Sequence, residues 1–203
     1  MILTNNYYYF KKALPLRICK KILAACHTRH LQEAVTVGSE KEWRGKTKHS
    51  PRECKVAWIA EQWIYDILNP FIHMANKKAG WNFQWDWNET SQYTCYTKGH
   101  FYGWHTDQSP NPFKHSNKNM DGKHRKISLT LQLTDEADYE GGDFQFAWFD
   151  FEKKNLLEIR TIDDAKKMGT IIIFPSFIYH QVLPVTKGKR ESLVNWSIGN
   201  AFN

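Results

Sequence analysis

The sequence predicts an α+β fold, mainly β, in which helices come first and short antiparallel strands then close into a sandwich or jelly roll. Hydrophobic residues recur at helical spacing in the first part of the chain, and from Trp81 onward the spacing changes to the two-residue period of strands. The 203 residues are 41% hydrophobic and 15% aromatic, which suits one domain with a large core. We therefore expect a single domain over 1–203, with a helical part at about 1–80 and a β core at about 81–203.

Two helices are predicted before the strands begin. The first covers 16–30 and starts after Pro15, a residue favoured at the start of a helix. The second covers 56–80 and should break or kink at Pro70, which cannot donate a backbone hydrogen bond. The hydrophobic stripe expected on the second helix consists of Ile59, Trp63, Ile67 and Phe71.

The β part begins with alternating aromatic residues at 81–88, which predict a strand with one aromatic face. Alternating or continuous apolar residues predict further strands at 127–134, 141–146, 170–175 and 190–198. Because the predicted strands are short and follow the helices, they favour the α+β class over alternating βαβ units.

Charge and cysteine content limit the classes of function. The chain has 28 Lys and Arg against 21 Asp and Glu, a net charge of +7, which favours acidic partners only as a long-range field. Its four cysteines form no CxxC pair, which excludes a zinc knuckle or a disulfide scaffold and fits a reducing compartment. Residues 1–21 lack the apolar run of a signal peptide or membrane span, so we expect a soluble, cytoplasmic protein.

The stretch HFYGWHTDQSP contains His105 and Asp107, two residues apart. Side chains at this spacing lie on one face of a strand, so both could reach one metal ion. Alone, the pair is better explained as a polar cluster at the end of a strand. His180 follows a buried type of strand, far enough along the chain to return beside the first. Two histidines and one carboxylate form the facial triad that suits non-haem Fe(II).

Arg190 and Ser192 share strand parity with Val194, Trp196 and Ile198. If those apolar residues face the interior, the guanidinium does too, and a buried cation requires an anion. The anion could be an internal Asp or Glu, or the far carboxylate of a 2-oxo acid that chelates the iron. We favour the 2-oxo acid because His180 lies shortly before Arg190 and Ser192 adds a hydroxyl.

From about Gln92 to Trp196 the sequence resembles the 2-oxoglutarate and Fe(II)-dependent dioxygenases, specifically the prolyl 4-hydroxylase-like group with its phage and bacterial members. The motif YTKGHFYGWHTD is similar to that group's metal-binding pattern, and YEGGDFQF to its Gly-Gly strand. The segment GTIIIFPSFIYHQVLPVTKGKR resembles the distal histidine segment, and Arg190-Glu-Ser192 the Arg-x-Ser form of the co-substrate anchor. The motif residues matched are Tyr96, Gly99, Tyr102, His105 and Asp107.

The resemblance implies a double-stranded β-helix, that is, a jelly roll with the N-terminal helices packed on one sheet. It implies metal ligation by His105, Asp107 and His180, and 2-oxoglutarate binding by Arg190, Ser192, Tyr96 and Tyr102. The implied reaction uses Fe(II), 2-oxoglutarate and O2, with ascorbate as a further reductant, and releases succinate and CO2 while hydroxylating a substrate C–H bond. A phage-encoded enzyme acting in a bacterial host is one source consistent with the group.

The substrate stays open at this point. A peptidyl proline comes first by resemblance, followed by another protein side chain, a nucleic acid and a small molecule. The basic segments 41–55 and 108–126 are expected to form the rim of the iron pocket and to act as lids. Alternatives on the same fold are an oxidative nucleic-acid demethylase, favoured by the net charge, an iron halogenase, which Asp107 argues against, and a non-catalytic binding module. Oligomeric state cannot be inferred.

Overall fold

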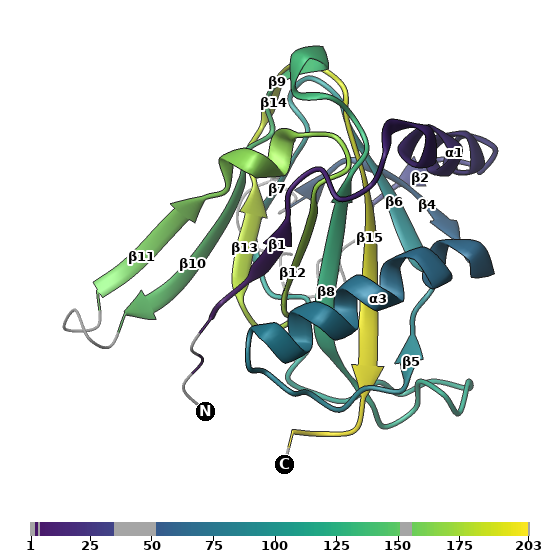
Figure 1. Ribbon diagram of the computed structural model, residues 1–203, viewed down its shortest axis with the longest axis vertical. Coiled ribbons are helices and arrows are strands. Elements are labelled where there is room, and N and C mark those ends of the chain that lie inside the picture. Colours follow the sequence, from purple (N-terminus) through teal and green to yellow (C-terminus); the bar gives the residue numbers. More distant parts are fainter. Residues whose placement is uncertain (1–2, 4, 35–51, 151–155, 203) are drawn as a thin grey trace, which may run out of the picture.

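The computed structural model describes residues 3, 5–34, 52–150 and 156–202, which form two facing antiparallel sheets with helices on the outer face of the larger one (Figure 1). The larger sheet has eight strands: β1 (Tyr8–Phe10), β12 (Ile171–Pro175), β8 (His124–Gln132), β15 (Arg190–Gly199), β6 (Ser91–Tyr96), β4 (Lys55–Ile59) and β2 (Gln32–Glu33), in that order, with β5 (Trp87–Asn88) beside β15. The smaller sheet has five: β11 (Leu156–Thr161), β10 (Phe144–Asp150), β13 (Tyr179–Val182), β7 (Phe101–His105) and β3 (Arg52–Glu53). β9 (Tyr139–Gly141) pairs with β14 (Val185–Gly188), and η1 (Glu136–Asp138) and η2 (Asp163–Lys166) are short 3-10 turns.

The strands at 127–134, 170–175 and 190–198 are confirmed as β8, β12 and β15. The segment 141–146 instead contains two strand ends, because Gly141 and Gly142 both have positive φ and separate β9 from β10. The first eighty residues also supply four strands, β1 to β4, so the expected division into a helical part and a β core is incomplete.

The helix α1 (Leu16–His27) confirms the first predicted helix, although it ends three residues early. Cys19, Ile22 and Cys26 are buried, at the three- and four-residue spacing that places side chains on one face of a helix. This face joins the cluster of apolar residues between the helices and the larger sheet. The free thiols of α1 therefore act as small core residues.

The helix α3 (Gln62–Lys78) begins six residues later than predicted, because 55–59 form the strand β4 between β2 and β6. Short apolar runs of this length fit a strand or a helix equally well. The helix also continues through Pro70, which lies on the exposed side, where water can reach the carbonyl group that loses its donor. Two expectations are therefore wrong: Ile59 does not belong to the helix, and the helix does not break at Pro70.

The buried face of α3 is displaced by one position from the predicted stripe. Ile64, Leu68 and Ile72 are buried, whereas the predicted Trp63, Ile67 and Phe71 are half-buried at the border of the same cluster. Figure 1 shows α3 crossing the larger sheet over β8 and β15. The buried face contacts the side of the sheet that carries Leu129, Leu131 and Leu193.

The predicted strand at 81–88 is wrong except for β5. Asn82 has a φ of 53°, which is incompatible with an extended strand. The buried amide of Asn76, in the last turn of α3, accepts from the backbone N–H of Phe83 and donates to its carbonyl, both at 2.9 Å. This side chain takes the place of a neighbouring strand and packs the aromatic residues of the segment against the helix.

Replacing Leu68 with alanine should lower the free energy of unfolding by about 3 kcal/mol, because it leaves a cavity beneath α3. The matched change Met74→Ala, on the exposed side of the same helix, should cost less than about 0.5 kcal/mol. Urea denaturation followed by circular dichroism measures both. A larger loss for Ile67→Ala than for Leu68→Ala would contradict the buried face described above.

Candidate metal centre and co-substrate pocket

The pairing of β7 with β13 brings the two candidate histidines together. His105, the last residue of β7, lies directly opposite His180, the second residue of β13. Asp107 follows β7, and its backbone N–H donates to the Ser176 carbonyl at 2.9 Å, just before β13 begins. The Asp107 carboxylate therefore lies beside both imidazole rings, at one end of the smaller sheet.

The ligand atoms of His105, Asp107 and His180 all lie within 4.8 Å of one another. His105 Nε2 is 3.8 Å from one carboxylate oxygen of Asp107, and His180 Nε2 is 3.6 Å from the other. Two atoms bound to one ion at about 2.1 Å each can be separated by up to about 4.2 Å. Both pairs that include Asp107 lie within this limit, so the three side chains are close enough to hold one divalent ion after small adjustments, and among the described residues no fourth ligand joins them.

Hydrogen bonds fix which nitrogen of each imidazole is free. His105 Nδ1 is 2.8 Å from the Gly103 carbonyl, and His180 Nδ1 is 3.0 Å from the Ile178 carbonyl. Because a carbonyl oxygen can only accept, each Nδ1 carries the proton and donates it. Both Nε2 atoms consequently present a lone pair toward Asp107, the arrangement usual for metal-binding histidines.

The protonation of the site also suits a metal. Burial lowers the pKa of His105 to about 3, so its ring is neutral near neutrality. Burial opposes the charge of Asp107, but the neighbouring histidines and Arg125 hold its pKa at about 2. The site offers a neutral imidazole and a carboxylate without having to lose protons first.

Aromatic rings surround the two histidines. Tyr102 stacks on His105 with ring centres 3.4 Å apart, and Phe174 lies 4.6 Å from His180. Phe144 and Phe146 complete the apolar wall around His180. These rings keep the histidines in place and shield the space above them from water.

Arg190 begins β15 and is buried, as is Ser192. Its Nη1 donates to Ser192 Oγ at 3.3 Å, and its guanidinium lies 5.5 Å from the centre of the Tyr96 ring. No carboxylate within the described residues lies within 4 Å of it, so the predicted alternative of an internal Asp or Glu finds no support there. The described part of the fold thus buries a cation without supplying an anion for it.

Unpartnered polar atoms lie beside this cation. Ser192 pairs with Thr94 on β6 and with Gln132 on β8, so the three form one row across three strands. Thr94 Oγ1 and Gln132 Oε1 are buried without a hydrogen-bond partner. Buried polar atoms are rarely left unpaired, and here they adjoin an uncompensated arginine. The row is therefore suited to a small polar anion.

A family model described as the 2OG-Fe(II) oxygenase superfamily matches residues 91–198, more than half of the chain. The chain belongs to the 2OG-Fe(II) oxygenase superfamily. The resemblance seen in the sequence between Gln92 and Trp196 is thereby confirmed. The metal and co-substrate of this superfamily, Fe(II) and 2-oxoglutarate, fit the residues just described: the triad offers nitrogen and carboxylate ligands, and the unpaired Arg190 faces polar atoms that a carboxylate could use.

The curated relatives that this oxygenase matches include PKHD-type hydroxylases. PKHD-type hydroxylases of Synechococcus sp. strain CC9902 and Idiomarina loihiensis are 38% and 33% identical to it over 98 and 101 residues, which are 48% and 50% of this chain. The matches span only 36% and 38% of those relatives' length.

A Pseudomonas putida prolyl-4-hydroxylase superimposes with a TM-score of 0.67 at 20% identity, covering 96% of this chain and 93% of that one. A viral collagen prolyl hydroxylase from Paramecium Bursaria Chlorella virus-1 has a TM-score of 0.62 at 18% identity, with 98% of each chain covered. At these identities the likeness shows the fold, and it confirms the predicted jelly roll with helices on one sheet.

Two arginines of this oxygenase, the buried Arg52 and the half-buried Arg125, were not predicted as structural residues. Arg125 donates to both carboxylate oxygens of Glu89, at 2.6 and 2.8 Å, and its guanidinium lies 3.8 Å from the centre of the Trp196 ring. Arg52 donates to the Gln92 side chain at 2.8 Å and lies 4.5 Å from the Tyr102 ring. Both belong to segments that were interpreted as basic rim loops.

The described residues cover the predicted rim segments only in part. Residues 35–51 lie outside the described residues, so the role expected for most of 41–55 stays a prediction. In the segment 108–126, β8 already begins at His124, and Arg125 and Lys126 are structural. The remaining loop is closed by two backbone hydrogen bonds between Phe113 and the 122–123 turn.

Replacing Asp107 or His180 with alanine should weaken Mn(II) binding by at least about tenfold, because each change removes one of three ligands. Mn(II) serves as an air-stable substitute for Fe(II), and its electron paramagnetic resonance signal measures the free ion. The control His30→Ala, at an exposed position beyond α1, should leave the affinity unchanged. Equal affinity in Asp107→Ala and the unmodified chain would exclude this metal centre.

Proposed function

We propose that the chain is a 2-oxoglutarate- and Fe(II)-dependent dioxygenase that hydroxylates a C–H bond of a peptidyl proline or another protein side chain. The observation that supports this best is that two features lie together between the sheets. One is a ligand triad with no fourth ligand among the described residues, and the other is a buried arginine with no carboxylate partner there. A closed structural metal site would need a fourth protein ligand. The triad alone fits other metal-binding functions. The buried arginine is the feature that favours 2-oxoglutarate as the co-substrate.

In this proposal His105, Asp107 and His180 hold the iron and leave three of six coordination positions for other ligands. The bound iron supplies the activation of O2. One oxygen atom enters succinate as 2-oxoglutarate loses CO2, and the other enters the substrate C–H bond, so four electrons reach O2, two from each organic molecule. Ascorbate would serve only to return oxidised iron to Fe(II).

Arg190 and Ser192 bind the distal carboxylate of 2-oxoglutarate. A guanidinium matches a carboxylate in a bidentate geometry, and the nearby polar row gives further partners. Burial raises the pKa of Tyr102 to about 12 and also raises that of Tyr96, so both phenols stay protonated and can donate hydrogen bonds to the same ligand.

The choice of a peptide substrate rests on likeness and on charge. Several solved structures of this fold are prolyl hydroxylases, and one, from Trichoplax adhaerens, holds a fragment of hypoxia inducible factor. Of the five Lys and Arg residues in the segment 108–126, Lys123 pairs with Asp86 at 2.7 Å, Arg125 pairs with Glu89, and Lys126 is buried. Lys114 and Lys118 are exposed, so two of the five cations are left for a phosphate backbone, which favours a peptide over a nucleic acid.

A reducing location fits the same proposal. All four cysteines are free and buried, as in proteins of the cytoplasm. Within the described residues no helix is both long and apolar enough to cross a bilayer.

Replacing Arg190 with alanine should weaken 2-oxoglutarate binding to the Fe(II)-loaded protein by about a hundredfold, because a charge-assisted bidentate contact is lost. Anaerobic isothermal titration calorimetry measures this without any need for the second substrate. Lys189→Ala is the control, since this neighbour is half exposed and pairs with Glu191 outside the pocket. Undiminished 2-oxoglutarate affinity in Arg190→Ala, with Mn(II) binding intact, would rule out the anchor.

Incubation with Fe(II), 2-oxoglutarate, ascorbate and proline-containing peptides should add one oxygen atom to a peptide, in step with succinate release. Mass spectrometry of the peptides and chromatography of succinate measure the two products. Oligonucleotides form the second arm, at two salt concentrations, because binding to phosphates weakens steeply with salt. Succinate release stimulated by oligonucleotides and by no peptide would reverse the choice of substrate class and keep the dioxygenase.

A further inference from the structure

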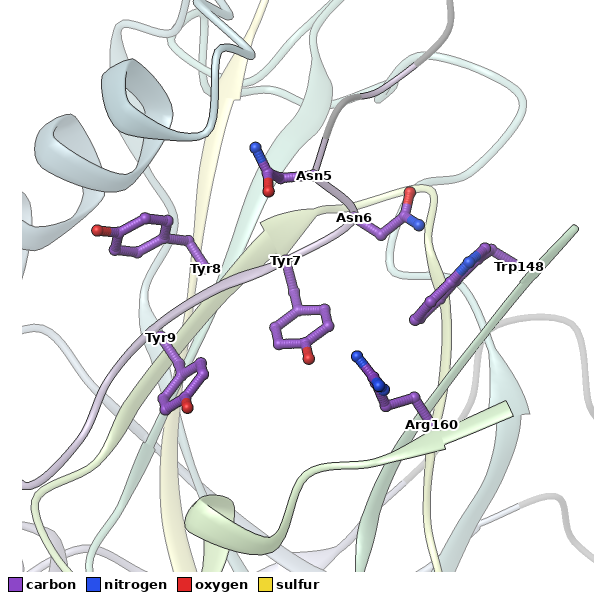
Figure 2. Close-up of a pocket in the computed structure, with 7 residues that line it drawn as sticks. All are labelled: Asn5, Asn6, Tyr7, Tyr8, Tyr9, Trp148 and Arg160. Atoms are coloured by element: carbon purple, nitrogen blue, oxygen red, sulfur yellow. The ribbon is translucent and has the colours of Figure 1, made fainter. Parts of the chain in front are cut away.

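A cavity of about 500 Å³ opens between the N-terminal segment and the β10–β11 hairpin. Figure 2 shows the Tyr7 ring, Trp148 and the Arg160 guanidinium turned toward a common space, whereas Tyr8 points to the other side of its strand. The cavity is lined by Asn5, Asn6, Tyr7, Tyr8, Tyr9, Trp148 and Arg160. None of these residues belongs to the metal centre or to the proposed 2-oxoglutarate pocket.

The register of the smaller sheet places the cavity next to the metal centre. His180 pairs with Phe146, and Phe146 pairs with Arg160, so the three residues form one row across β13, β10 and β11. Adjacent strands are about 4.8 Å apart, which puts the Arg160 backbone about 10 Å from that of His180. Tyr7 stacks on Phe146 with ring centres 5.1 Å apart. Phe146 thus lies between the cavity and a metal ligand.

The cavity also lies at the same end of the sheet as the metal centre. β13 begins at Tyr179, which pairs with Ala147, but β10 continues to Asp150. Trp148 therefore projects beyond the end of β13, on the side where His105 and His180 lie. A substrate peptide whose target residue lies at the metal can extend along the inner face of the β10–β11 hairpin into the cavity.

The polar groups of the cavity lack partners. No carboxylate in the described part of the chain lies within 4 Å of the exposed Arg160 guanidinium. In the same described residues, the Asn6 amide, the Tyr7 hydroxyl and the Trp148 indole N–H make no hydrogen bond. Asn5, by contrast, is bonded to Ala79 and Trp81. One cation and three hydrogen-bonding groups between aromatic walls suit a carboxylate side chain on a peptide.

We propose that this cavity is a subsite for an acidic residue of the peptide substrate, three or four residues away from the residue that is hydroxylated. The inference rests on the proposed hydroxylation of a peptide. The spacing follows from the distance of about 10 Å, because an extended peptide rises about 3.3 Å per residue. Arg160 pairs with the carboxylate, and Tyr7 and Trp148 contact the intervening apolar part of the peptide.

The test uses fluorescein-labelled proline peptides in which a single aspartate occupies each position on either side of the proline in turn. Fluorescence anisotropy measures their binding to the full chain loaded with Mn(II) and 2-oxoglutarate. An aspartate three or four residues from the proline should bind about tenfold more tightly than asparagine there. Arg160→Glu should abolish this preference and produce one for lysine at the same position.

The matched control is Arg17→Glu, on the exposed side of α1, which should keep the preference for aspartate. Arg160→Glu must also retain the Mn(II) affinity, which shows that the sheet is intact. Equal affinity for aspartate and asparagine at every position, or no binding of any peptide, overturns the subsite. If the protein binds no 2-oxoglutarate but still shows the Arg160-dependent preference for aspartate, this result contradicts the proposed dioxygenase activity and supports the peptide subsite.

Discussion

The antiparallel register that sets His105 opposite His180 is the constraint on which the site depends. Side chains alternate across a strand, so a slip of one residue between β7 and β13 would turn one histidine to the opposite face. Two backbone donors just after β7, at Asp107 and Gln108, bond to the same Ser176 carbonyl and oppose such a slip. The same contact places the carboxylate beside the imidazoles, so one turn sets both the register and the third ligand.

The same alternation gives the two faces of the larger sheet different roles. On β15 the side chain of Leu193 points to the helices, whereas its neighbour Ser192 joins the polar row between the sheets. Helix α3 supplies the apolar contacts that stabilise the sheet from outside. Among the described residues, the inner face can therefore hold Arg190 without a carboxylate partner and Thr94 Oγ1 and Gln132 Oε1 without a hydrogen bond, although each is costly to bury.

Local pattern was sufficient where one face of a strand is buried and the pairing is regular. The parity of Arg190 and Ser192 could be predicted because it follows from the strand period alone. His105 and Asp107 were also predicted to lie together, but Asp107 comes after the end of β7 and is placed by the backbone hydrogen bond to Ser176. Arg125 could not be predicted, because a bulge near Ser197 shifts the pairing and changes the face on which it lies. The segment after α3 depends on the Asn76 amide, seven residues before Phe83, and β4 depends on its neighbours β2 and β6. Neither kind of partner shows in the hydrophobic period of the segment itself.

The arginines show why net charge predicts partners poorly in this chain. Arg125 meets the carboxylate of Glu89 and is satisfied within the fold. Arg190, which is more deeply buried, contacts the Ser192 hydroxyl and the Tyr96 ring and has no carboxylate partner among the described residues, so we expect its anion to come from a ligand. Arg160 lies on the edge strand β11, in the same row as His180, and also lacks a carboxylate among the described residues. The role of each arginine depends on whether the residues beside it supply an anion. Strand register determines which residues lie there, and the amino-acid composition does not reveal it.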